Sequence, residues 1–241
     1  MQEILLATDL DETLIGDDAA LKSLNILLSE LRAKSHLKLA YVTGRSLESY
    51  DLLVAEKSLL TPDVLVTSVG TEIYWNTTDL SREWPQVIEL DSRAIMTALH
   101  DIPNLTLQPE IAQRPYRIAY YLKADIKTLA LIKRRLDNFS VDVIYSHQEY
   151  LDILPKGVNK GSSLAYLAAH WNIDIANIIA CGNSANDIDM LRIGKAIVVA
   201  NSRQELLDWV FSQEPTENVY LAKQGYAAGI TEGVKNFQRL Q

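Results

Sequence analysis

Two aspartates stand two residues apart where an apolar run near the start of the chain ends. The run 5–7 leads through Thr8 to Asp9 and Asp11. In open α/β sheets, ligand sites lie at the carboxyl ends of strands, so we expect both side chains to project into a crevice. Two close carboxylates repel each other, which predicts a cation between them or a proton on one of them. An oxygen-rich site of this kind suits Mg²⁺. One aspartate could attack phosphorus while the other transfers protons.

An Asp-x-Asp pair can also be only a turn or a helix cap. The functional interpretation therefore depends on three further segments as well. Segment 43–45 ends a second apolar run. There a hydroxyl and free N–H groups can hold phosphate oxygens, unless the segment is only a glycine turn capped by Ser46. Lys160 opens a helical stretch and can neutralise a phosphate or a carboxylate, although a lone lysine is more often a solvated charge. The run 178–181 breaks into the polar segment 182–187, which could equally be an ordinary loop.

The elements that must position these residues alternate between short apolar runs and amphipathic stretches. This pattern predicts an α/β fold with a parallel sheet flanked by helices. The candidate buried strands are Ile4–Ala7, Leu37–Val42, Val64–Thr67, Ile178–Cys181 and Ala196–Val199. A helix is expected over Ala19–Ala33, where leucines recur at helical spacing.

The middle of the chain follows a different pattern. Segments Arg117–Leu122 and Val141–Ser146 alternate apolar and polar residues, which is typical of one-sided sheets. Helices are expected over Asp91–His100 and Asp125–Asn138. We therefore predict a core domain made of residues 1–77 and 157–241, with a second α/β domain of residues 78–156 inserted between its halves.

Composition excludes several classes of function. The chain has 241 residues, of which 48% are hydrophobic and 22% charged, and it carries a net charge of −8. An acidic chain argues against general nucleic-acid binding but not against a small phosphorylated substrate. Cys181 is the single cysteine, which excludes an internal disulfide and fits the cytoplasm. No targeting or membrane-spanning segment is recognised, so we expect an intracellular protein without membrane partners.

Taken in order, the four segments resemble the motifs of the haloacid dehalogenase superfamily of phosphohydrolases. The matching residues are Asp9-Leu10-Asp11-Glu12-Thr13, Thr43-Gly44-Arg45, Lys160 and Gly182-Asn183-Ser184-Ala185-Asn186-Asp187. The resemblance implies a Rossmann-like core, and the place of the inserted domain resembles the subclass with a type-two (C2B) cap. Further segments are most similar to sucrose-phosphate phosphatases. These segments are Thr67–Tyr74, Gln113–Tyr120, Asp152–Pro155 and Asn159–Gly161.

The resemblance also implies a role for each motif residue. Asp9 would be the nucleophile, and Asp11 the general acid and base whose backbone carbonyl also faces Mg²⁺. Thr43 would hold phosphate, Lys160 would steady Asp9 and the phosphoryl group, and Asp187 would hold metal directly or through water. The implied substrate contacts are Thr43, Gly44, Arg45, Gly70, Glu72, Gln113, Arg117, Asn159, Lys160 and Asn186. The implied Mg²⁺ ligands are Asp9, Asp11, Asn183 and Asp187.

The expected activity is hydrolysis of sucrose 6-phosphate by a monomer, with sucrose-phosphate synthase as a candidate partner. Phosphatases of glucosylglycerol phosphate and mannosylfructose phosphate share much of the pattern, so their substrates remain alternatives. One departure matters, because Asn183 stands where the superfamily usually has aspartate. Its amide oxygen can still face Mg²⁺, but the site loses one negative charge. We expect weaker metal affinity, and the alternatives are a sugar-phosphate-binding protein without turnover or a phosphomutase.

Overall fold

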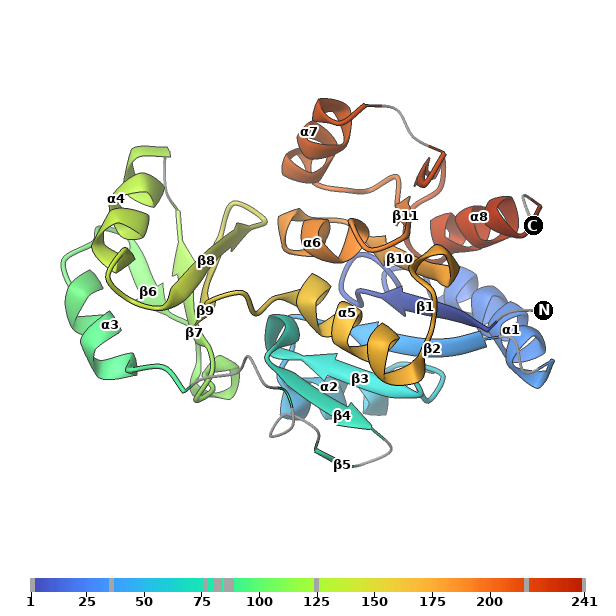
Figure 1. The fold of residues 1–241 in the computed structure, drawn as a ribbon, viewed down its shortest axis with the longest axis horizontal. Coiled ribbons are helices and arrows are strands. Elements are labelled where there is room, and N and C mark those ends of the chain that lie inside the picture. The colour runs from blue at the N-terminus through green and yellow to red at the C-terminus, as the bar shows by residue number, and fades with distance from the viewer. Residues whose placement is uncertain are drawn as a thin grey trace.

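The computed structural model describes residues 3–34, 37–75, 78–79, 84, 89–123, 126–214 and 217–239. Within these ranges the strands form two separate sheets (Figure 1). The larger sheet has eight strands in the order β12-β11-β10-β1-β2-β3-β4-β5, and the smaller has four in the order β6-β7-β9-β8. No helix in the described part of the chain is both long and apolar enough to cross a membrane.

The larger sheet confirms the predicted α/β fold class. Its strands are β1 (Ile4–Thr8), β2 (Leu37–Val42), β3 (Val64–Thr67), β4 (Glu72–Trp75), β5 (Thr78–Asp79), β10 (Ile178–Gly182), β11 (Lys195–Val198) and β12 (Val219–Leu221). Neighbouring strands from β12 to β3 run parallel, whereas β4 and β5 each pair antiparallel to their neighbour. The five strands predicted from apolar runs all lie in the parallel part, with ends that shift by one residue at most.

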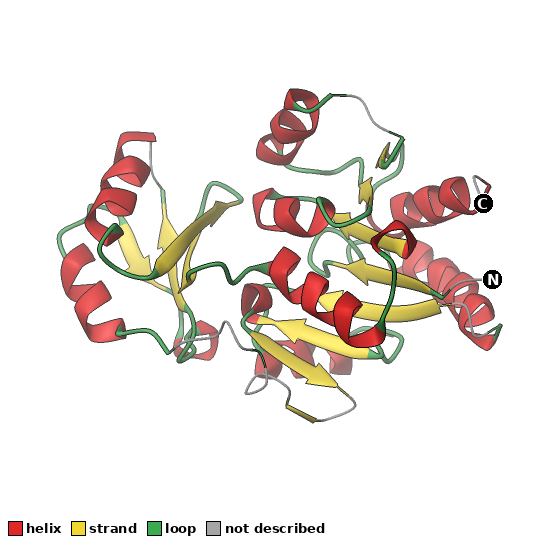
Figure 2. Ribbon diagram, in the orientation of Figure 1, coloured by secondary structure: helices red, strands yellow, loops and turns green. Residues whose placement is uncertain are grey.

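Helices cover both faces of this sheet, as Figure 2 shows. They are α1 (Asp18–Ala33), α2 (Leu47–Glu56), α5 (Lys160–Trp171), α6 (Ile188–Leu191), α7 (Gln204–Ser212) and α8 (Tyr226–Arg239). Leu6 of β1 packs in one apolar core with α1, α2 and α8, while its neighbours Leu5 and Ala7 pack in another with α5, α6 and α7. Because successive side chains of a strand point to opposite faces, β1 is apolar throughout and is held from both sides.

The smaller sheet is antiparallel and covered on one face. Its strands are β6 (Leu105–Leu107), β7 (Ile118–Leu122), β8 (Val141–Ser146) and β9 (Tyr150–Pro155). Helices α3 (Ser92–Leu99) and α4 (Ile126–Leu136) pack on it through a third apolar core. The two helices predicted for this region are therefore present. Helix α3 is one residue shorter at each end than predicted and α4 ends two residues early, while Asp125 lies outside the described residues.

The predicted domain division stays a proposal with one adjustment. Thr77, the last residue of its first core segment, lies outside the described residues. The pair Thr78–Asp79 was assigned to the inserted domain, but it forms β5 and pairs with β4 of the larger sheet. The smaller sheet begins only at Leu105 and ends at Pro155, close to the predicted return to the core.

Candidate active site

Three residues far apart in the sequence meet in a buried cluster at the end of β1. Asp9 follows β1, Lys160 is the first residue of α5, and Asp187 ends the short helix η4 (Ala185–Asp187). The Lys160 ammonium donates to Asp9 Oδ1 and to Asp187 Oδ1 at 2.7 Å each. All three residues are buried. The parallel pairing of β1 with β10 brings the first and last motifs together, because both strands end at the same edge.

Burial and charge oppose each other in this cluster. Burial is the main reason that the pKa of Asp9 rises to about 7, with Lys160 opposing the rise and Asp187 adding to it. For Lys160, burial alone would lower the pKa, but the two carboxylates outweigh it and raise the pKa above its ordinary value. The lysine therefore stays charged inside the protein and holds both carboxylates in place.

Both oxygens of Asp187 are committed to this framework. While Oδ1 accepts from Lys160, Oδ2 accepts the backbone N–H groups of Asn183 at 2.9 Å and Ser184 at 3.0 Å. Gly182 makes this approach possible, since a Cβ at that position would lie 2.4 Å from the Cβ of Asp187. Asp187 therefore orients the Lys160 ammonium, and a role toward metal would run through water.

Asn183 presents a buried side-chain oxygen that accepts no hydrogen bond from the part of the chain that the structure describes. The residue is fully buried, and its amide nitrogen lies 3.4 Å from Glu12 Oε2. A buried carbonyl oxygen without a partner is costly unless a cation or water satisfies it. No group of three or more His, Cys, Asp and Glu side chains in the described residues is arranged for a metal. A donor set of Asp9 and the Asn183 amide oxygen nevertheless fits Mg²⁺, which prefers few protein oxygens and retains waters.

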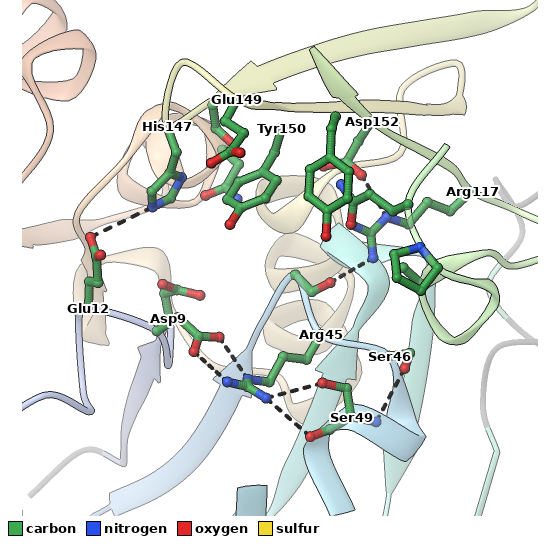
Figure 3. A pocket seen from close by; sticks show the side chains of 18 of the residues that line it. Asp9, Glu12, Arg45, Ser46, Ser49, Arg117, His147, Glu149, Tyr150 and Asp152 are labelled. Carbon is green, nitrogen blue, oxygen red and sulfur yellow. Dashed lines mark hydrogen bonds and ion pairs between the residues drawn. The ribbon is translucent and has the colours of Figure 1, made fainter. Parts of the chain in front are cut away.

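Asp11 is held by an arginine of the second motif. Arg45 Nε and Nη2 donate to Asp11 Oδ2 and Oδ1 at 2.8 and 2.7 Å. Arg45 Nη1 donates to the carbonyl oxygen and hydroxyl of Ser49 (Figure 3). The hydrogen bonds to Asp11 are the main cause that raises the pKa of Arg45. Thr43 is buried behind this pair, and its Oγ1 accepts the N–H of Arg45 at 3.1 Å. A paired guanidinium of this kind fixes the orientation of the carboxylate.

A cavity of about 590 Å³ opens above these groups, between the two sheets. Such a volume suits a small molecule, since ligand sites typically measure roughly 300–1,000 Å³. Its lining from the larger sheet's side includes Asp9, Asp11, Glu12, Gly44, Arg45, Asn186 and Arg203. Its lining from the inserted segment includes Gln108, Arg117, Tyr121, Ser146, His147, Glu149, Tyr150 and Asp152.

Two polar contacts join the inserted segment to the core around this cavity. Arg117 donates to Asp152 Oδ1 and to the carbonyl oxygen of Gly44, both at 2.7 Å (Figure 3). On the other side, the Arg203 guanidinium donates to both Glu12 oxygens at 2.7 and 2.8 Å, and His147 Nε2 lies 3.9 Å from Glu12 Oε2. The cavity is therefore bounded on two sides by polar contacts across the segments.

Comparison with known proteins places this geometry in a family. Residues 2–238 match the family described as sucrose-6F-phosphate phosphohydrolase. The chain belongs to this family. It is 34% identical over 251 residues to sucrose-phosphatase 1 of Nicotiana tabacum, covering 97% of this chain and 59% of that relative. The chain thus spans about three fifths of the plant relatives' length.

Solved structures agree with this family membership. The sucrose-phosphatase of Synechocystis, in complex with sucrose and phosphate, is 30% identical with a TM-score of 0.91, and the match covers 99% of both chains. A haloacid dehalogenase subclass IIB sugar phosphatase matches with a TM-score of 0.69 at 13% identity and shows the fold alone, covering 98% of each chain. The predicted superfamily and its Rossmann-like core are confirmed.

In this member of the sucrose-phosphatase family, some predicted sugar contacts are not among the residues that line the cavity. They are Glu72, Gln113, Asn159 and Gly70. Glu72 accepts the hydroxyls of Thr67 and Ser68, and its other oxygen faces Arg114. The Gln113 amide is bonded to three backbone groups of the inserted segment. Both side chains are therefore engaged within the protein.

Two further predicted substrate contacts, Asn159 and Gly70, have roles in local structure. Asn159 caps α5, accepting the N–H of Ser162 at 2.8 Å. Gly70 has φ +101°, and a Cβ there would lie 2.3 Å from the Asn159 carbonyl oxygen, so glycine permits the close approach. These contacts explain their place in the chain without a ligand.

Sequence reasoning missed most of the inserted segment's contribution to the cavity. Tyr121, Glu149 and Tyr150 line it, but none was singled out from the sequence. His147 lines the cavity as well. The available signal was the alternation in β7, where Tyr121 stands between the buried Tyr120 and Leu122.

Proposed function

We propose that this protein is an Mg²⁺-dependent sugar-phosphate phosphatase that hydrolyses sucrose 6-phosphate to sucrose and phosphate. The observation that carries the proposal is the buried Asp9–Lys160–Asp187 cluster, whose Asp9 lines a cavity of about 590 Å³. Family membership supports the reaction class. The sucrose and phosphate bound by the Synechocystis relative support the choice of sugar.

In the proposed reaction, Asp9 is the nucleophile and Lys160 orients it. An Asp9 oxygen attacks phosphorus and the bond from phosphorus to the sugar oxygen breaks, leaving an aspartyl-phosphate. Asp11 must start the reaction protonated: it gives this proton to the departing sugar oxygen, and the carboxylate so formed later takes a proton from the water that hydrolyses the aspartyl-phosphate. The ammonium of Lys160 offsets negative charge on Asp9 and on the phosphoryl group.

The expected metal would be held by Asp9, the Asp11 backbone carbonyl and Asn183, with Asp187 acting through water. When bound, Mg²⁺ supplies charge stabilisation to the phosphoryl oxygens. The chain's own residues then orient the ester. Arg45 holds the Asp11 carboxylate, and the inserted segment shields the reaction from bulk water.

The test is phosphate release from a panel containing sucrose 6-phosphate, glucosylglycerol phosphate, mannosylfructose phosphate and glucose 6-phosphate. We expect the highest kcat/KM for sucrose 6-phosphate and a loss of at least about 10³-fold in Asp9→Asn. Unchanged release by Asp9→Asn would remove Asp9 as the nucleophile. Free phosphate without a phosphorylated sugar product separates a phosphatase from a phosphomutase.

A binding protein without turnover is the second candidate, and Asn183 is the observation that favours it. The amide adds no negative charge where the superfamily usually has a carboxylate. Sugar-phosphate binding without phosphate release at high Mg²⁺ would establish this candidate. We also propose that the protein is a monomeric cytoplasmic enzyme and that sucrose-phosphate synthase is a candidate partner.

A further inference from the structure

Glu12 lies beside Asn183, although 171 positions separate the two residues in the sequence. Glu12 follows Asp11 in the turn after β1, and Asn183 comes directly after β10. The Asn183 Nδ2 group donates to Glu12 Oε2 at 3.4 Å. Glu12 also lines the cavity, where Figure 3 shows it across from His147. A carboxylate of the first motif therefore contacts the residue that departs from the superfamily pattern.

The positions of Glu12 and of the Asn183 backbone are both fixed by the fold. Glu12 has φ +57°, which is uncommon for a residue other than glycine, and its carbonyl oxygen accepts Asn201 Nδ2 at 2.7 Å. The Asn183 N–H donates to Asp187, and its carbonyl oxygen accepts the Arg203 N–H at 2.7 Å. The Arg203 guanidinium in turn holds both Glu12 oxygens. Glu12, Asn183 and Arg203 thus form a closed ring of contacts.

Within this ring, Glu12 distinguishes the two ends of the Asn183 amide. An amide nitrogen donates hydrogen bonds and an amide oxygen accepts them, whereas a carboxylate only accepts. Glu12 can therefore pair with Nδ2 but not with Oδ1. Turning the amide over would place Oδ1 against the Glu12 carboxylate, where the two oxygens repel each other. The contact leaves Oδ1 as the free end, and Oδ1 accepts no hydrogen bond within the described residues.

We propose that Glu12 is a positioning residue that orients the Asn183 amide so that its Oδ1 faces the Mg²⁺ of the proposed site. The inference rests on the proposed function for the identity of the metal. It explains how a neutral amide can stand where the superfamily usually has a carboxylate. An aspartate offers an oxygen in either orientation, but an asparagine must be turned the right way. Groups that orient a metal ligand typically contribute about 10–100-fold to metal affinity.

The first test measures Mg²⁺ binding to four metal-free proteins by calorimetry. They are wild type, Glu12→Gln, Asn183→Asp and the double variant. Glu12→Gln alone should raise the Kd for Mg²⁺ about tenfold, because a glutamine amide can donate to Oδ1 and turn it away. With Asn183→Asp already present, Glu12→Gln should raise the Kd by less than about threefold, since no amide is left to orient. If Glu12 acted only through its negative charge, the two losses would be equal.

The matched control is Glu149→Gln, which removes another carboxylate from the cavity lining. Its Kd for Mg²⁺ should stay within about twofold of the wild-type value, because Glu149 is part of the inserted segment and solvent screens its charge. Melting temperatures of the metal-free proteins separate orientation from a purely structural role. A lower melting temperature in Glu12→Gln with an unchanged Kd would overturn the proposal.

The second test observes the amide itself by NMR in protein labelled with ¹⁵N at asparagine. The Asn183 side-chain signals are identified by their absence in Asn183→Ser. In the metal-free wild type, the Nδ2 proton bonded to Glu12 should resonate apart from its geminal partner, and Glu12→Gln should reduce that separation. An unchanged separation, equal losses of Mg²⁺ affinity in the two backgrounds, or no Mg²⁺ binding by wild type would overturn the proposal. Absence of phosphate release with the predicted Mg²⁺ pattern intact would reject the proposed function and keep the role of Glu12.

Discussion

The base and the wall of the cavity are built in opposite ways. At the base, Asp9, Lys160 and Asp187 are buried and bonded to one another or to backbone N–H groups. On the wall, Tyr121 and Tyr150 are more than one third exposed and make ring contacts. Buried charges tolerate little change because each one needs its partners. Exposed rings can be altered without loss of the fold. The difference separates a buried base of paired charges from a partly exposed aromatic wall.

The largest effect should come from removing the lysine of the base. Lys160→Met leaves Asp9 and Asp187 facing each other in a buried site without their cation. The free energy of unfolding, measured by urea denaturation in EDTA, should fall by about 3–5 kcal/mol. Lys156→Met is the matched control, since Lys156 is 67% exposed in its pair with Asp142, and its effect should be small. Equal losses in the two variants would contradict the contrast between buried and exposed charge.

A carboxylate at position 183 should raise the affinity of the proposed site for Mg²⁺. Asn183→Asp adds a negative charge to the proposed Mg²⁺ donor set and should lower the Mg²⁺ concentration for half-maximal binding about tenfold, measured by calorimetry. In the metal-free protein the same charge lies near Glu12 and should lower the melting temperature. Asn183→Ser, which adds no charge, is the control. The interpretation is wrong if Asn183→Asp binds Mg²⁺ no more tightly than wild type.

The pH dependence of stability should report the burial of Asp9. Its pKa is about 7 in the folded protein against an ordinary value of 3.8, so between about pH 4 and 7 the folded state binds more protons than the unfolded state. The free energy of unfolding of the metal-free protein should therefore fall as pH rises through this window. Asp9→Asn removes the titrating group, and its profile should fall less steeply. Parallel profiles for the two proteins, measured by urea denaturation in EDTA, would show that Asp9 does not titrate in this way.

The smallest effect should come from the exposed ion pair beside the wall. Arg203 and Glu12 are each 43% exposed, so Arg203→Gln should change the free energy of unfolding by no more than about 1 kcal/mol. KM for sucrose 6-phosphate should change by less than about threefold. Arg192→Gln, in the exposed pair with Asp189, is the control. A loss as large as that of Lys160→Met would break the distinction between base and wall.

The base could be predicted from sequence because its residues follow strand ends. Asp9 comes directly after β1 and Asp187 lies in the turn after β10, and neighbouring parallel strands bring such turns together. Lys160 was ambiguous alone, and only its place among the other motifs indicated its role. The predicted sugar contacts Glu72 and Gln113 came from resemblance, and the structure engages both side chains within the protein.

The wall could not be predicted because it depends on register. Tyr121 and Tyr150 meet only when β7 pairs with β9, and alternation within one strand does not reveal its partner. Moreover, β9 was not recognised as a strand, since Asp152 interrupts its apolar run and Pro155 ends it. The structure explains the interruption, because Asp152 is buried against Arg117 and needs no solvent.

The short β8–β9 turn has a consequence for how such proteins diversify. It spans only residues 147–149, and its own backbone closes it, with the Glu149 N–H donating to the Ser146 carbonyl at 3.2 Å. Two of its residues, His147 and Glu149, line the cavity, so exchanging them would alter the groups offered to a bound molecule while Asp9 and Lys160 stayed unchanged. Under the proposed function, substitutions confined to this turn are a direct way to change which sugar phosphate the protein accepts.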